Sequence, residues 1–62
     1  MFNIYVQFSD SNGFEDTFNP IESLDDAKHF ANRWKQGAFT YLPDEIKKVR
    51  VLDSSSNIVY EI

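Results

Sequence analysis

The chain contains no cysteine, and this limits how its 62 residues can be held in one fold. Neither a disulfide nor a thiolate-bound metal is available, so the burial of apolar side chains has to stabilise the structure. A domain of this size buries only about 60 % of the surface that its unfolded chain exposes. The ten aromatic residues, which can each bury about 150 to 250 Å², are therefore expected to supply most of the core. The length predicts a single small domain over residues 1–62.

The first strand is predicted by an alternation of apolar and polar residues. Every second position is apolar at Phe2, Ile4, Val6 and Phe8, which is typical of a strand with one buried face. A turn sequence follows, and a three-residue loop with Gly13 in the left-handed region would place Phe18 opposite Val6 on that face. The same register puts Asp16 opposite Phe8, as an inward charge that protects an edge strand. We therefore expect a hairpin with a bulge at Gly13.

A helix is predicted between Ser23 and Gly37. Ser23 is a good N-cap, and the two acidic residues that follow Leu24 complement the positive end of the helix dipole. Gly37 is placed to end the helix. The spacing of the apolar residues predicts a buried stripe made of Leu24, Ala27, Phe30, Ala31 and Trp34.

Two further strands are predicted over residues 46–53 and 57–62, joined by three serines. A turn at residues 55 and 56 gives the inner pairs Val51–Tyr60 and Val49–Ile62 and the outer pairs Arg50–Glu61 and Leu52–Val59. The alternative is a three-residue loop that pairs Val51 with Val59 and turns Ile58, Tyr60 and Ile62 outward. That alternative exposes more apolar surface, so we rank it second.

These elements predict an α+β domain of ββαββ order, with a four-stranded sheet and one helix packed on one face. The first and last strands are the most apolar, which favours placing them side by side, in parallel, at the centre. This element order resembles the β-grasp, as in the immunoglobulin-binding domains of streptococcal protein G, and the resemblance implies fold alone. A simple meander is the alternative strand order.

Charge is ordered along the chain. The first 27 residues hold six acidic groups and no Lys or Arg, whereas all six basic residues lie between Lys28 and Arg50. Two differently charged surfaces are therefore expected, within a net charge of −4. The acidic surface could steer a basic protein partner towards this chain. It consists of Asp10, Glu15, Asp16, Glu22, Asp25 and Asp26.

The leading functional hypothesis is a small non-enzymatic protein-interaction module. In size, acidity and lack of catalytic groups the chain resembles small inhibitors encoded by phages and mobile elements, including anti-CRISPR and other anti-defence proteins. The resemblance implies binding to a basic, nucleic-acid-handling host protein. A second predicted contact surface is the outer sheet face, where Tyr5, Leu52 and Val59 would meet a partner protein or a second copy of the chain.

The alternative hypothesis is a small nucleic-acid-associated protein. Basic residues alternate along the third strand, and an aromatic in the connector could stack on bases. The residues concerned are Lys47, Lys48, Arg50 and Tyr41. The net charge of −4 opposes attraction to a polyanion, so nucleic acid is the less favoured partner.

No catalytic residue, metal site or cofactor is predicted. His29 and Asp25 lie one turn apart and could act together, but two ligands do not make a metal site and the pair lies outside the apolar stripe. The sequence DSNG at residues 10–13 begins like a calcium loop and lacks the remaining ligands. Neither a signal peptide nor a membrane-spanning apolar run is recognisable, so we expect a cytoplasmic protein that is not an enzyme and does not bind membranes.

Overall fold

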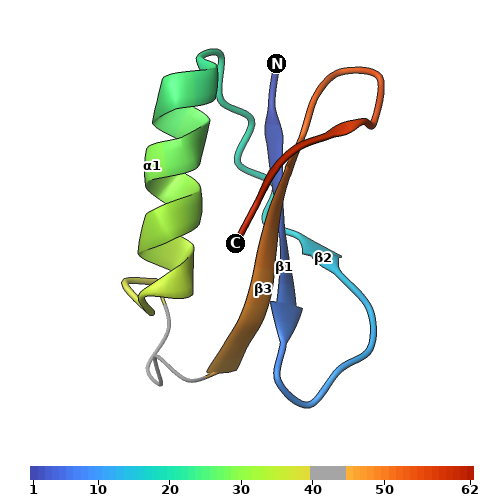
Figure 1. Cartoon of the computed structure of the whole chain (residues 1–62), viewed down its shortest axis with the longest axis vertical. Helices are drawn as coiled ribbons and strands as arrows, with labels where there is room; N and C mark the ends of the chain where they lie inside the picture. Colours follow the sequence, from blue (N-terminus) through green and yellow to red (C-terminus); the bar gives the residue numbers. More distant parts are fainter. Residues whose placement is uncertain (40–44) are drawn as a thin grey trace.

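The computed structural model describes residues 1–39 and 45–62 as a four-stranded sheet with one helix packed on one face (Figure 1). The strands are β1 (Asn3–Phe8), β2 (Glu15–Asp16), β3 (Ile46–Leu52) and β4 (Ile58–Glu61), and the helix is α1 (Leu24–Lys35). The order of elements is therefore ββαββ, which confirms the predicted α+β class.

β1 and β3 form the centre of the sheet, in the order β2-β1-β3-β4 with every neighbouring pair antiparallel. The prediction that the first and last strands pair in parallel is wrong, and a meander would have placed β2 beside β3. β3 suits the centre because it is seven residues long and buries Ile46, Val49 and Val51. β4 has only four residues, and its Ile58 and Val59 stay exposed, as suits an edge strand.

The fully buried core is aliphatic, contrary to the expectation that aromatic rings would supply most of it. Among the described residues the buried hydrophobic side chains are Ile4, Val6, Ile21, Ala27, Ala31, Ile46, Val49 and Val51. Aromatic residues pack around this cluster and are only half-buried, as at Phe2, Phe8, Phe30, Trp34 and Tyr60. The rings therefore seal the margin of the layer between helix and sheet.

Helix α1 lies against β1 and β3 through two alanines one turn apart. Ala27 and Ala31 are both 0 % exposed, and their small side chains allow the helix backbone to approach the sheet closely. The predicted apolar stripe is therefore confirmed, with its larger members flanking the alanines. Residues on the opposite side of the helix, Asp25, His29 and Asn32, are exposed, as the 3.6-residue period predicts.

Both ends of α1 are closed by hydrogen bonds of the predicted kind. The Ser23 hydroxyl oxygen accepts the backbone N–H of Asp26 at 3.4 Å, as expected of an N-cap. At the other end Gly37 has φ of 81° and its N–H donates to the Trp34 carbonyl at 3.0 Å. The next N–H, of Ala38, donates to the Arg33 carbonyl at 3.0 Å, which completes a Schellman motif.

The β3–β4 hairpin combines the two predicted registers. A three-residue loop with Ser56 at φ of 65° pairs Leu52 with Ile58, as in the alternative that we ranked second. The register then shifts, and Val51 lies opposite Tyr60 and Arg50 opposite Glu61, as in the preferred one. Val59 is the extra residue of this β-bulge. The predicted pair Leu52–Val59 is therefore wrong, because Ile58 takes the place of Val59.

A second register shift lies between β1 and β3. Gln7 pairs with Lys48 and Phe8 pairs with Ile46, which leaves Lys47 without a partner in the ladder. The bulge returns Ile46 to the inner face, where it is 5 % exposed, although strict alternation from Lys48 would turn it outward. Both Lys47 and Lys48 remain exposed.

The β1–β2 hairpin differs most from prediction. Val6 lies opposite Glu15 rather than Phe18, a shift by an odd number of residues that moves β2 side chains to the other face. Phe18 is consequently 85 % exposed, with a left-handed φ of 56°. Gly13 is not among the described residues with positive φ, so it forms no left-handed bulge. β2 contains only Glu15 and Asp16, and without an apolar residue its sequence does not fix the register.

A pair of matched isoleucine variants tests the inner face. Ile4→Ala is expected to lower the free energy of unfolding by about 2 to 5 kcal/mol, because it opens a cavity at a residue that is 0 % exposed. Ile58→Ala, at a residue 52 % exposed, should change it by less than about 0.5 kcal/mol. Urea denaturation followed by tryptophan fluorescence measures both free energies. If Ile4→Ala is unfolded, Ile4→Val replaces it, with an expected loss of about 0.5 to 1.5 kcal/mol. Equal losses at the two positions would contradict this assignment.

The left-handed backbone at Phe18 predicts a stabilising substitution. Phe18→Gly should raise the free energy of unfolding by about 0.5 to 1 kcal/mol, because glycine has no Cβ to clash at a φ of 56°. This value already includes the opposing effect of glycine, which makes the unfolded chain more flexible. The control is Phe18→Ala, which keeps the Cβ and should bring no such gain. If the two variants have the same urea midpoint, this backbone carries no strain.

Candidate functional site

The outer face of the sheet, opposite α1, carries side chains that the helix does not cover. The pairing register aligns four of them in one row across the strands, Asp16, Tyr5, Arg50 and Glu61. Directly paired residues of antiparallel strands share a face, with Cβ atoms about 4.5 to 5.5 Å apart. An arginine and a tyrosine therefore lie between two carboxylates on an open sheet surface.

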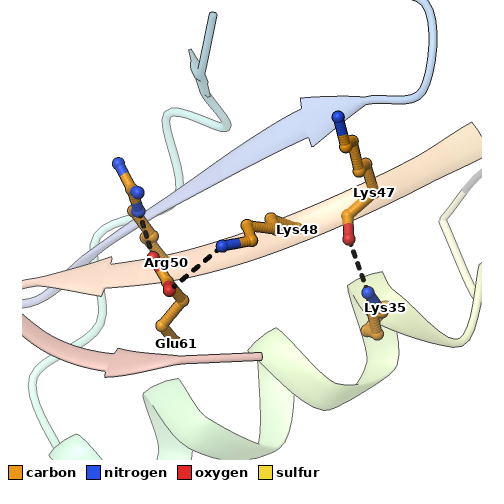
Figure 2. A network of polar contacts seen from close by, with 5 residues as sticks. All are labelled: Lys35, Lys47, Lys48, Arg50 and Glu61. Atoms are coloured by element: carbon orange, nitrogen blue, oxygen red, sulfur yellow. Dashed lines mark hydrogen bonds and ion pairs between the residues drawn. The ribbon is translucent and has the colours of Figure 1, made fainter. Parts of the chain in front are cut away.

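Arg50 is held from two sides on this face. Its guanidinium carbon lies 4.1 Å from the centre of the Phe14 ring, and its Nε donates to Glu61 Oε2. Lys48 Nζ lies 3.5 Å from the other carboxylate oxygen of Glu61, so two cations share one carboxylate (Figure 2). The predicted Arg50–Glu61 pair is thereby confirmed, and it includes Lys48 as well.

The basic residues of the nucleic-acid hypothesis lie on β3, near the end of α1. Lys35 Nζ donates to the backbone carbonyl of Lys47 at 2.6 Å, which links the helix to the bulge (Figure 2). Lys47 and Lys48 are exposed, whereas Arg50 is half-buried. Tyr41, the aromatic proposed to stack on bases, lies outside the described residues.

The acidic residues of the N-terminal half follow the β2 side of the sheet. Phe2 and Ile21 form a bridge, so residues 15–22 run along the same edge of β1 and lead to the start of α1. We call five carboxylate side chains there the acidic edge: Glu15, Asp16, Glu22, Asp25 and Asp26. None of them is in an ion pair among the described residues, where both ion pairs use Glu61. The β1–β2 loop, which contains Asp10, lies at the opposite end of the molecule from the start of α1 (Figure 1).

Apart from Met1 and Phe39, the large exposed apolar residues of the described chain lie in two places. The β3–β4 register puts Ile58 opposite Leu52, and because Leu52 alternates with the buried Val51, both belong to the outer face with Tyr5. Val59, the predicted member of this face, is 37 % exposed at the bulge. The other place is Phe18, on the acidic edge. The preferred registers place both Phe18 and Ile58 on the inner face, and only the β3–β4 register ranked second turns Ile58 outward, as the structure has it.

The described residues hold no group of three or more His, Cys, Asp or Glu side chains that could bind a metal ion. His29 and Asp25 are both exposed on α1. In residues 10–13 the Ser11 hydroxyl oxygen accepts the N–H of Gly13 at 3.2 Å, as in a local turn. Within the described parts of the chain no helix is long and apolar enough to cross a membrane.

Two carboxylates have lowered pKa values. Hydrogen bonding to Arg50 holds the pKa of Glu61 below its ordinary 4.5, and the positive charge of Lys48 acts in the same direction. The backbone N–H of Asn57, 2.9 Å from Asp53 Oδ1, holds the pKa of Asp53 below its ordinary 3.8. Asp53 also accepts the N–H of Ser55 at 2.9 Å, so it organises the β3–β4 loop.

Comparisons of the chain with protein-family models, curated proteins and solved structures find no match. The side chains that the fold brings together are therefore the only indication of function.

The two lowered pKa values predict a pH dependence of stability. A carboxylate whose pKa is depressed in the folded state contributes stability that is present above its unfolded pKa and is lost as the pH falls through the folded value. The unfolding midpoint in urea should therefore decrease as the pH drops below the ordinary values of 4.5 and 3.8. Asp53→Asn combined with Glu61→Gln should flatten that decrease. A double variant with the same slope as the parent would show that other carboxylates are responsible.

Proposed function

We propose that this protein is a small non-enzymatic interaction module that binds a basic protein through its acidic edge. The observation that carries the proposal is the charge arrangement: the five carboxylates lie along one side of the sheet and none is in an ion pair among the described residues. Carboxylates in such a series add their fields and accelerate the encounter with a positively charged surface. Their charge is thus available to a partner.

Phe18 supplies the apolar part of the proposed contact. Its ring is 85 % exposed in the middle of the acidic edge, between Asp16 and Glu22 in the sequence. The backbone around it is fixed, because Asp16 Oδ1 accepts the N–H of Phe18 at 2.8 Å and the Thr17 hydroxyl donates to the Ile4 carbonyl at 2.9 Å. An aromatic ring on a fixed backbone loses little entropy on binding and is typical of an interface anchor.

A nucleic-acid-handling protein is the class of partner that this surface fits best. Such proteins carry basic grooves, and an acidic protein can occupy a groove of that kind in place of the phosphate backbone. We include in the proposal a cytoplasmic location and a role as an inhibitor encoded by a phage or mobile element. Both rest on sequence composition and on the resemblance described above.

The second candidate is direct binding of nucleic acid by β3. The exposed side chains of Lys47 and Lys48 favour it. Glu61 opposes it, because its carboxylate already neutralises part of the charge of Lys48 and Arg50. The net charge of −4 further weakens the attraction of a polyanion, so we rank this function second.

The test is capture of partners from a lysate of the source organism, followed by affinity measurement with the purified partner. The proposal requires a basic partner whose affinity falls as salt is raised. Glu15→Gln with Glu22→Gln should weaken binding by about tenfold, equivalent to about 1.4 kcal/mol. Phe18→Gly should weaken it by about 30-fold or more, as expected of an anchor residue.

Two controls separate binding from folding. Phe18→Gly is expected to be more stable than the parent, so a loss of affinity in that variant does not reflect unfolding. Asp10→Asn removes a carboxylate from the β1–β2 loop, at the opposite end of the molecule from the start of α1, and should change affinity by less than the edge variants (Figure 1). Binding that is indifferent to the edge variants, or binding of a labelled oligonucleotide that Lys47→Gln abolishes, would contradict the proposal.

A further inference from the structure

On the outer face of the sheet, Arg50 has more hydrogen-bond donors than it uses among the described residues. A guanidinium group carries five N–H donors, and here Nε donates to Glu61. Among the described residues no hydrogen bond from its two terminal nitrogens is formed. The side chain is 33 % exposed, so part of it is open to a ligand from the solvent side.

The contacts of Arg50 fix its orientation. The guanidinium carbon lies over the Phe14 ring, 4.1 Å from its centre, and Glu61 accepts a hydrogen bond from Nε. A guanidinium group fixed at these two points presents its remaining donors as a planar fork, which matches the two oxygens of a carboxylate. Little side-chain entropy is left to lose when such a ligand binds.

The local charge also suits an anion. Lys48 and Arg50 carry two positive charges, and Glu61, which contacts both, supplies one negative charge. These three contacting side chains therefore carry a net charge of +1, within a protein whose net charge is −4. Tyr5, directly opposite Arg50, and Leu52 on the same face provide aromatic and apolar surface beside it.

We propose that Arg50 is the receptor for a single carboxylate side chain of the protein partner, bound on the outer sheet face. This rests on the proposed function, since it names a second group by which the same partner is recognised. A basic partner with one acidic residue beside its basic surface would meet the acidic edge and Arg50 together. Discrimination between partners then depends on the position of that acidic residue.

The geometry favours a lone carboxylate over a nucleic-acid strand. Asp16 and Glu61 stand at the two ends of the row that contains Arg50. A phosphate chain that followed this row would bring several negative charges next to those carboxylates, which like-charge repulsion disfavours. A single carboxylate brings one negative charge instead of several, so it meets less of that repulsion when it reaches the guanidinium group.

The experiment uses the purified protein and two short probe peptides, acetyl-Leu-Asp-Val-amide and its uncharged match acetyl-Leu-Asn-Val-amide. NMR titration follows the Nε–Hε signal of Arg50 and the ring signals of Phe14 and Tyr5. We expect the Asp peptide to shift these signals saturably, with a Kd of about a millimolar. The Asn peptide should not saturate in the same range.

Two variants examine the stacked fork itself. Arg50→Lys keeps the charge but loses the planar donors, and should lower the affinity for the Asp peptide by about tenfold. Phe14→Leu keeps apolar volume but removes the aromatic face, and should lower that affinity by a smaller factor. Both variants need a native-like spectrum, which shows that the sheet has formed. Retention of full binding by Arg50→Lys would overturn the proposal.

Other outcomes also decide the question. Equal shifts with the Asp and Asn peptides, or no saturable shift, would overturn the proposal. Tight binding of an oligonucleotide that Arg50→Lys weakens would assign the site to nucleic acid instead. The peptide titration needs no partner protein and involves no residue that the edge variants change. If the peptide titration gives a negative result, the proposed role of the acidic edge still stands. If the edge variants do not change partner binding, the result for Arg50 still stands.

Discussion

The close contact between α1 and the central strands is the interaction on which the rest of this structure depends. Ala27 and Ala31 bring the helix backbone against β1 and β3, and the buried hydrophobic side chains of the described residues are all aliphatic. The larger side chains of α1, such as Phe30 and Trp34, are pushed to the margins and cover the sides of this thin core. The single helix of the described chain covers one face of the sheet, so the other face is in contact with water. The row of charged residues and Tyr5 on that face makes this contact favourable.

The parts of the fold that sequence could predict are those in which several local signals agree. For α1 the N-cap Ser23, the apolar period and Gly37 all indicate the same bounds. The β3–β4 pairs Val51–Tyr60 and Arg50–Glu61 follow from apolar and charge matching at once. The β2 register could not be predicted, because Glu15 and Asp16 hold no apolar residue that marks an inner face.

The β-bulges explain most of the remaining differences. An extra residue at Lys47 or Val59 changes which side chains face inward without changing the composition of the strand. For the candidate site, the sequence indicated Arg50, Lys48 and the acidic series, but not the ring of Phe14 beneath Arg50 or the exposure of Phe18. Those two features arise from the β1–β2 register, which only the folded chain defines.

The strand order has a consequence for how the chain folds. β1 lies near the start of the sequence and its central partner β3 near the end, with β2 and α1 between them. Sheet formation therefore requires the closure of a loop that contains most of the chain, a topology of high contact order that slows folding. Until β3 is available, β1 has only the two-residue β2 as a strand partner, and such a hairpin is marginal by itself. On a ribosome the sheet can therefore form only after β3 has left the exit tunnel.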